Sequence, residues 1–171
     1  MKILRNRAGY TLTEMMVAVA ILGILSLVGP PLMIGLQNFF LMTSARTETQ
    51  RDARACLSEI NRFLRQAEAS TVVIDNASNQ GPYSRITFSL LDGRTMSFSQ
   101  SGDQLIQTVT SAAGVKSSVV LTKNLSYIAF TYPATDDVSI ISVALTMSKN
   151  IQLGKSKVLE LTVQKVRIMN S

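Results

Sequence analysis

An uncharged stretch near the N-terminus constrains this chain more than any other feature. Residues Met15–Leu36 form a run of 22 residues without a charged side chain, and a helix needs roughly 20 apolar residues to span a bilayer core. We therefore expect one membrane-spanning helix. Lys2, Arg5 and Arg7 precede the run without an acidic residue. Because positive charge holds the flank of a first apolar segment in the cytoplasm, the N-terminus is predicted to stay inside.

The order of small and apolar residues differs from that of a conventional secretory signal. Such a signal has a shorter apolar core, and its small-residue cleavage site comes after that core. Here the small pair Ala8 and Gly9 comes before the apolar run. A single acidic residue, Glu14, stands at the rim of the run. Both features need an explanation beyond simple export.

The segment RAGYTLTEMMVAVAILGIL resembles the N-terminus of type IV pilins and type II secretion pseudopilins. In that superfamily a prepilin peptidase cleaves after the glycine, the new terminal residue is N-methylated, and the apolar helix stays on the mature protein. The resemblance implies that residues 1–9 are a leader peptide, that cleavage falls between Gly9 and Tyr10, and that Tyr10 becomes the methylated terminus. Tyr10 departs from the phenylalanine that is usual at this place.

Glu14 is expected to have a charged partner. A charge at the centre of a membrane helix costs roughly 2.5 to 3.5 kcal/mol. After cleavage, the α-amine of Tyr10 would lie about one helical turn before Glu14, and two unit charges ~4 Å apart attract by ~4 kcal/mol at an effective dielectric constant near 20. The amine could belong to the same chain or to a neighbour. The resemblance implies the neighbour, which makes Glu14 a registration residue between subunits; the alternative is that Glu14 snorkels to the interface.

Two prolines interrupt the presumed membrane helix. Proline lacks the N–H group of a normal helical residue, so Pro30 and Pro31 leave the carbonyl groups of Ser26 and Leu27 without helical partners. Gly23 and Pro31 match helix-weakening positions of the superfamily, and Pro30 is additional. The resemblance implies a segment that loosens in the filament. An ordinary membrane-helix kink, satisfied by neighbouring helices, is the alternative.

The residues after the apolar run keep a helical period. One apolar stripe recurs at steps of three and four residues, which indicates an amphipathic helix facing a core: Ala53, Cys56, Leu57, Ile60, Phe63, Leu64 and Ala67. We therefore predict one helix from Tyr10 to about Ala67. Cys56 lies on the stripe and is interpreted as a small core residue instead of a reactive thiol.

The remainder of the chain has the two-residue period of half-buried strands. Ile86, Phe88 and Leu90 alternate before the turn signal Asp92-Gly93, which predicts a β-hairpin. Similar patterns predict six to eight short antiparallel strands in all. The fold class is α+β and pilin-like: one long N-terminal helix, hydrophobic in its first half and amphipathic in its second, packed on an antiparallel β-sheet. Residues 10–42 would form the transmembrane and assembly helix, and residues 43–171 the soluble domain.

The composition argues against enzymatic chemistry. The chain contains no histidine, which excludes Ser-His-Asp and Cys-His catalysis. Cys56 is the only cysteine, so no intramolecular disulfide can form. The sequence also shows neither a metal-ligand cluster nor a glycine-rich phosphate loop. We expect no enzymatic activity, no cofactor and no metal.

The resemblance implies a pilin-like structural subunit of a type IV pilus or type II secretion system, possibly of the J-type or W-type minor class. It would be a single-pass inner-membrane protein with its soluble domain in the periplasm or outside, and part of a pilus or pseudopilus after assembly. Its partners would be other pilin or pseudopilin subunits, prepilin peptidase, the inner-membrane assembly platform and, before assembly, membrane lipid. The alternative is a DNA-binding minor pilin of a competence system, which the sequence does not favour. It would use a C-terminal excess of basic residues: Lys149, Lys155, Lys157, Lys165 and Arg167.

Overall fold

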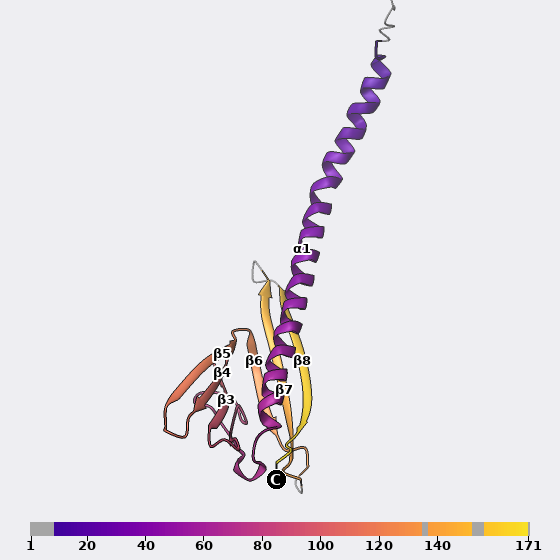
Figure 1. The fold of residues 1–171 in the computed structure, drawn as a ribbon. Coiled ribbons are helices and arrows are strands. Elements are labelled where there is room, and N and C mark those ends of the chain that lie inside the picture. The colour runs from indigo at the N-terminus through magenta and orange to yellow at the C-terminus, as the bar shows by residue number, and fades with distance from the viewer. Residues whose placement is uncertain (1–8, 135–136, 152–155, 171) are drawn as a thin grey trace, which may run out of the picture. The chain divides into compact units, whose positions relative to one another are not determined.

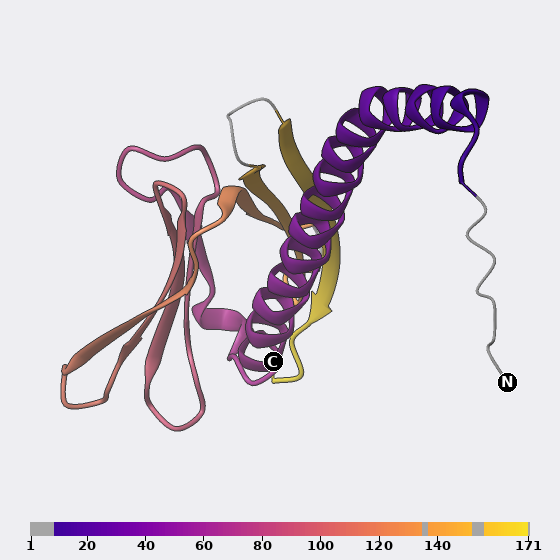
Figure 2. The same ribbon diagram turned by 90° about the horizontal axis from the view of Figure 1, so that it is seen from above.

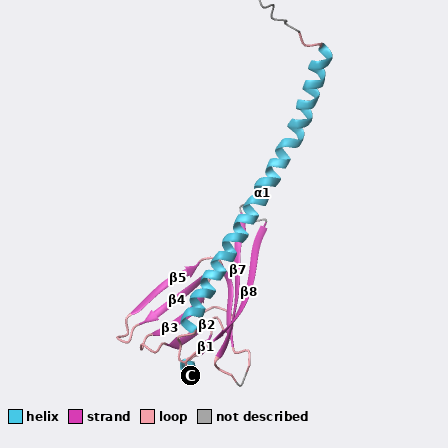
Figure 3. Cartoon of the chain, turned by 45° about the vertical axis from the view of Figure 1, so that its right-hand side comes forward, coloured by secondary structure: helices cyan, strands magenta, loops and turns pink. Residues whose placement is uncertain are grey.

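The computed structural model describes residues 9–134, 137–151 and 156–170, with only the backbone for 156–160. One long helix is followed by antiparallel strands, an α+β pilin-like architecture (Figures 1 and 3). The elements are α1 Leu12–Leu64, the short 3-10 helix η1 Ala69–Thr71, β1 Val73–Asp75, β2 Arg85–Ser89, β3 Thr95–Ser101, β4 Gln104–Thr110, β5 Lys116–Thr122, β6 Leu125–Thr131, β7 Ile140–Ile151 and β8 Ser156–Arg167. The chain divides into two compact units, residues 1–41 and 42–171, which are described separately.

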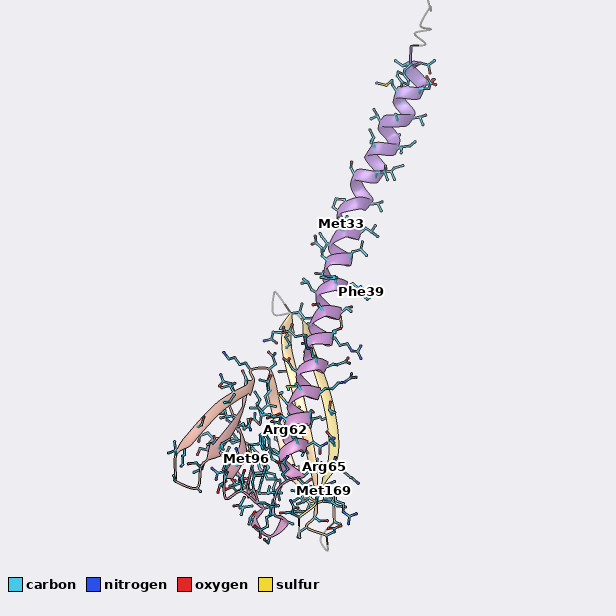
Figure 4. The ribbon with its side chains drawn as sticks, in the orientation of Figure 1. Met33, Phe39, Arg62, Arg65, Met96 and Met169 are labelled. Atoms are coloured by element: carbon cyan, nitrogen blue, oxygen red, sulfur yellow. The ribbon has the colours of Figure 1, made fainter. Side chains whose placement is uncertain are left out.

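The first unit contains the apolar part of α1. The helix begins at Leu12, two residues later than the period predicts, because Thr11 forms its cap. The large apolar side chains of residues 12–41 are exposed, including Met33 and Phe39, which project from the helix in Figure 4. An 18-residue window has a mean hydropathy of 2.3 and none of it is buried. By length and composition, α1 can therefore cross a membrane.

The second unit contains the amphipathic part of α1. Its buried side chains recur every three or four residues, as predicted: Ala45, Thr49, Ala53, Cys56, Leu57, Ile60 and Leu64. Cys56 is 3% exposed, which confirms it as a core residue. The helix ends at Leu64, about three residues earlier than predicted, because Gln66 and Ala67 bond three residues back instead of four. Such short bonds tighten the last turn and let the chain leave the helix.

The strands form two antiparallel meanders instead of one sheet. The first sheet has the order β1-β2-β3-β4-β5 and the second the order β6-β7-β8; Figure 2 shows the two groups of strands apart. The predicted hairpin is confirmed, since Ile86 pairs with Phe98 and Phe88 with Met96. Its turn places Gly93 at a φ of 81°, which glycine adopts without steric cost.

One core joins α1 to both sheets. Ile60, Phe88, Phe98 and Phe130 are fully buried in it, and the rings of Phe88 and Phe98 stack with 6.2 Å between centroids. Burial of this apolar surface is the main force that holds the helix against the strands.

A buried amide connects the two sheets. Gln100 of β3 is 6% exposed, and its Oε1 accepts a hydrogen bond from the backbone N–H of Ile128 in β6 at 3.2 Å. Its Nε2 donates to the carbonyl groups of Ser126 at 3.2 Å and Gly102 at 3.0 Å. Both polar atoms of the Gln100 side chain therefore have hydrogen-bond partners where the two sheets meet.

The C-terminal residues return to the end of α1. The N–H of Met169 donates to the carbonyl of Arg65 at 3.4 Å, and the N–H of Ala69 donates to the carbonyl of Asn170 at 3.0 Å. Glu68 and Asn170 also form an isolated parallel bridge. The last described residues therefore close the fold against its helix.

Candidate functional site

The predicted cleavage junction lies just before α1. Gly9 and Tyr10 have no regular secondary structure, and Tyr10 is 86% exposed. Apart from Gly9 and its two chain neighbours, no atom lies within 4 Å of the position that a Cβ at Gly9 would occupy. The peptide bond between them is accessible and outside the helix, where proteolysis is generally easiest. The rest of the predicted leader, residues 1–8, lies outside the described residues.

Thr11 and Glu14 form a reciprocal cap on the first turn of α1. The backbone N–H of Thr11 donates to Oε2 of Glu14 at 2.8 Å, and the backbone N–H of Glu14 donates to Oγ1 of Thr11 at 3.3 Å. The Thr11 hydroxyl also donates to the same Oε2 at 3.0 Å. This arrangement is a capping box, which satisfies two N–H groups that a helix start leaves without partners.

The capping role of Glu14 is additional to the charge role that the sequence suggested. Its signal was present, because Thr-Leu-Thr-Glu has the Thr-x-x-Glu spacing of a capping box. The N–H of Thr11 belongs to the peptide bond after Tyr10, so cleavage before Tyr10 leaves the cap intact. No described residue donates a hydrogen bond to Oε1 of Glu14. One carboxylate oxygen is therefore free to accept a cation.

The three predicted helix-weakening residues all lie within α1. The backbone stays helical through Pro30 and Pro31. A Cβ added at Gly23 would meet no atom within 4 Å, so close packing does not require glycine there in this chain. The Ser26 hydroxyl donates to the carbonyl of Leu22 at 2.8 Å, a bond that often bends helices. Loosening at Gly23, Pro30 and Pro31 stays a prediction.

The predicted basic residues are only partly brought together. Lys149 lies apart in an ion pair with Glu48, with 2.5 Å between Nζ and Oε2. Lys165 and Arg167 are exposed on β8. Lys155 and the side chain of Lys157 lie outside the described residues. Of the predicted basic residues with described side chains, Lys165 and Arg167 lie together and Lys149 does not.

A groove in the second unit adds a cation that the sequence analysis missed. A hollow of about 680 Å³ is lined by Asn61, Arg65, Ser139 and residues 165–169. Figure 4 shows Arg65 close to Met169, and 3.8 Å separates Nη2 from Sδ. Because Arg65 is a hundred positions before Lys165 in the chain, no sequence pattern links the two residues. The fold alone brings the end of α1 to β8.

Two of the groups with shifted pKa values bear on the chemistry of the second unit, Cys56 and Asp137. Burial, with a smaller contribution from the negative charge of Asp52, raises the pKa of the Cys56 thiol to about 12. The thiol is therefore neutral at ordinary pH and not a nucleophile. Hydrogen bonds from Ser139, together with the attraction of Arg167, lower the pKa of Asp137. That carboxylate is charged near the rim of the groove.

Residues 4–29 match the family model of the prokaryotic N-terminal methylation motif. The chain carries the type IV pilin and pseudopilin signature. The methylation motif includes the Gly9–Tyr10 junction, the Thr11–Glu14 cap and the first part of the apolar run. It points to a structural subunit. No curated protein matches the chain, so the assignment to a J-type or W-type class stays a prediction.

Proposed function

We propose that the chain is a pilin-like structural subunit, a minor pilin or pseudopilin, of a type IV pilus or a type II secretion system. One observation carries the proposal: the methylation motif stands directly at the start of a helix that is long and apolar enough to cross a membrane. The apolar part of α1 anchors the subunit in the inner membrane. Assembly then extracts it into a helical filament by head-to-tail contacts that do not close.

Processing precedes assembly in this proposal. Prepilin peptidase cuts between Gly9 and Tyr10 and leaves Tyr10 as an N-methylated terminus. The exposure of Tyr10 and the lack of helix at the junction support access by a peptidase. The cut also creates a positive α-amine one residue before the capping Thr11.

Glu14 links processing to assembly. Its Oε2 already accepts hydrogen bonds from Thr11, whereas its Oε1 is free for the α-amine of Tyr10 in a neighbouring subunit. In apolar surroundings such an amine is strongly destabilised without a counter-charge. Pairing with Glu14 would set the register between neighbours. The partners are other pilin or pseudopilin subunits and the inner-membrane assembly platform.

Mass spectrometry of the membrane-extracted protein tests the proposal. In cells with an active prepilin peptidase, we expect a chain that begins with N-methylated Tyr10 and fractionates into sheared filaments. Gly9→Leu should leave the precursor uncut. The matched variant Gly29→Leu, at a glycine of α1 that also faces open space, should be cut normally. An intact Met1 terminus on the wild-type chain would overturn the proposal.

A DNA-binding minor pilin is the second candidate. Arg65, Lys165 and Arg167 around one groove favour it, while the pairing of Lys149 with Glu48 weakens it. Binding of duplex DNA should then decrease steeply with salt, because each neutralised phosphate releases a counterion. Salt-independent or undetectable binding would remove this candidate.

A further inference from the structure

The outer edge of β8 is open. Within the described residues, β8 pairs with β7 alone, and it is the outermost strand of its sheet in Figure 1. The N–H of Ile168 donates to Ser139 next to β7 at 2.8 Å. Backbone N–H and C=O groups alternate in direction along a strand. Those of the even-numbered residues of β8 therefore point towards β7. The N–H and C=O groups of the odd-numbered residues point away from β7, towards the open edge. The N–H of Met169 confirms the alternation, because it donates to the carbonyl of Arg65 on that side.

The opposite edge of the same sheet is closed. Along β6, the N–H of Phe130 donates to the carbonyl of Tyr83 at 2.9 Å, and that of Leu125 donates to the carbonyl of Asp103 at 2.9 Å. The N–H of Ile128 donates to Gln100. Folded proteins usually protect open strand edges, because unpaired backbone groups recruit other strands. The contrast singles out β8 as the side on which this sheet can grow.

The same outward residues carry exposed side chains. Leu161 is 68% exposed and Val163 58% exposed, and Lys165 and Arg167 are exposed beyond them. A strand added at this edge would therefore meet two apolar side chains and then two basic ones. Arg65, which directly follows α1, adds a third positive charge beside the basic end.

The three cations have no ion-pair partner among the described side chains. Asp137 attracts Arg167, but its Oδ1 already accepts hydrogen bonds from the N–H and hydroxyl of Ser139. The net charge of this end is positive. An incoming segment with carboxylates would gain both backbone hydrogen bonds and charge pairing.

We propose that the open edge of β8 binds an extended acidic segment of a partner protein by strand addition. Backbone hydrogen bonds to residues 161–167 supply affinity, and alternate side chains supply specificity. The segment places apolar residues opposite Leu161 and Val163, and Asp or Glu opposite Lys165 and Arg167. A segment of about seven residues can pair with residues 161–167, because the added strand and β8 both rise ~3.4 Å per residue. The inference rests on residues 42–171 and does not depend on filament assembly.

The test uses the full chain in detergent micelles and fluorescent ten-residue peptides. Each peptide has valine at two alternate positions, glutamate at the next two alternate positions and threonine between them. Both sequence directions are made, because a strand can add in parallel or antiparallel orientation. Anisotropy should show saturable binding of one direction to the wild-type chain. No binding of either peptide at about 1 mM would overturn the proposal.

Val163→Pro tests the backbone contact. It deletes an N–H that faces outward, so the bonds to β7 remain, and proline is tolerated at such edge positions. We expect affinity to fall by about tenfold or more, since the added strand loses a hydrogen bond and meets the proline ring. Val163→Ile keeps the N–H and should bind normally. Equal binding by Val163→Pro, with an unchanged circular dichroism spectrum, would overturn the proposal.

A proline on the other sheet is the matched control. The N–H of Ser111 donates to the carbonyl of Val115 at 2.9 Å, so the backbone groups of Val115 point towards β4. By the same alternation, the N–H groups of the even-numbered residues of β5 point outward. Val120→Pro therefore deletes an outward N–H at the edge of the first sheet. Peptide affinity should not change. A loss equal to that of Val163→Pro would overturn the assignment to β8.

Charge reversal decides the matter even if Val163→Pro fails to fold. The double variant Lys165→Glu, Arg167→Glu should lose the acidic peptide and bind a version with lysine in place of glutamate. Lys116→Glu on β5 should behave as wild type. Duplex DNA that binds through Lys165 and Arg167 without peptide binding would assign the surface to nucleic acid. Self-association abolished by Val163→Pro would assign it to a second copy, and either outcome overturns the proposal.

Discussion

A single carboxylate, Glu14, caps α1 and has a second, proposed role as a charge partner. Through Oε2 it completes the cap of α1 with Thr11, and its charge is available to an α-amine. A glutamine at this position preserves the capping geometry, because the capping box accepts either Glu or Gln. Substitution can therefore separate the two roles without disturbing the start of the helix.

Glu14→Gln should insert into the membrane but assemble poorly. It lowers the insertion cost of a charge and removes an attraction of up to ~4 kcal/mol with the Tyr10 amine. We expect the fraction of subunit in sheared filaments to fall by about tenfold or more. Thr11→Val removes the capping hydroxyl at a cost of ~1 kcal/mol, keeps the acid and should assemble nearly normally. Normal incorporation of Glu14→Gln would favour a snorkelling side chain.

Cys56 should make stability depend on alkaline pH. Burial raises its pKa from 9.0 to about 12, so the unfolded chain loses the proton first. The free energy of unfolding is unaffected below pH 9 and falls as the pH rises towards 12, by an amount on the order of 4 kcal/mol over the whole range. Urea unfolding at pH 8 and pH 10.5 should show this loss in wild type. Cys56→Ala should show a smaller loss, and equal losses in both proteins would contradict the prediction.

At the scale of elements, the sequence predicted structure wherever one face of an element is buried. Burial of one face produces the apolar stripe through Cys56 and Ile60 and the alternation of Ile86 and Phe88. The sequence pattern could therefore predict α1 and the first hairpin. The division into two sheets could not be found in this way. The contact that joins the two sheets, from the N–H of Ile128 to Oε1 of Gln100, pairs a side chain with the backbone of a distant segment and leaves no period in the sequence.

The candidate site was predictable to the extent that it is local. Gly9, Tyr10 and Glu14 lie within one short, recognisable motif. The Thr-x-x-Glu spacing of Thr11 and Glu14 also indicated the cap. The approach of Arg65 to β8 was not, because tertiary packing creates it. Likewise, strand alternation predicts which residues share a face but not which strand is left at an edge.

Gly23→Ala should stiffen α1. Alanine is favoured over glycine by ~1 kcal/mol within a helix, and its Cβ would meet open space. Amide exchange near residue 23 should slow about fivefold in the membrane-bound subunit. If filaments require a loosened segment there, incorporation should decrease, while the matched variant Gly35→Ala should assemble normally. Unchanged exchange would show that Gly23 is not a weak point.

At the scale of the whole molecule, the amphipathic part of α1 belongs to the core of the second unit. A chain that starts at Thr43 keeps the buried stripe from Ala45 onward and lacks the apolar run. A chain that starts at Thr71 lacks the part of α1 that packs in the same core as Phe88 and Phe98. These two truncations therefore test whether the strands can fold without the helix.

The chain starting at Thr43 should be soluble, folded and rich in β-structure. The chain starting at Thr71 should aggregate, because it exposes the apolar sheet faces. Size-exclusion chromatography with circular dichroism distinguishes the two results. A monomeric, cooperatively unfolding protein from the shorter chain would show that α1 is not part of the core.

The return of residues 169 and 170 to the end of α1 also has a consequence for the order of biosynthesis. A ribosome makes the anchor first, and the strands of each meander can pair with neighbours made moments earlier. The hydrogen bonds of Met169 and Asn170 with Arg65 and Ala69, however, join segments about a hundred residues apart and can form only once residue 170 has been made. A nascent subunit can thus be tethered to the bilayer well before its fold is complete. These contacts of the second unit form only after residues 169 and 170 have been added.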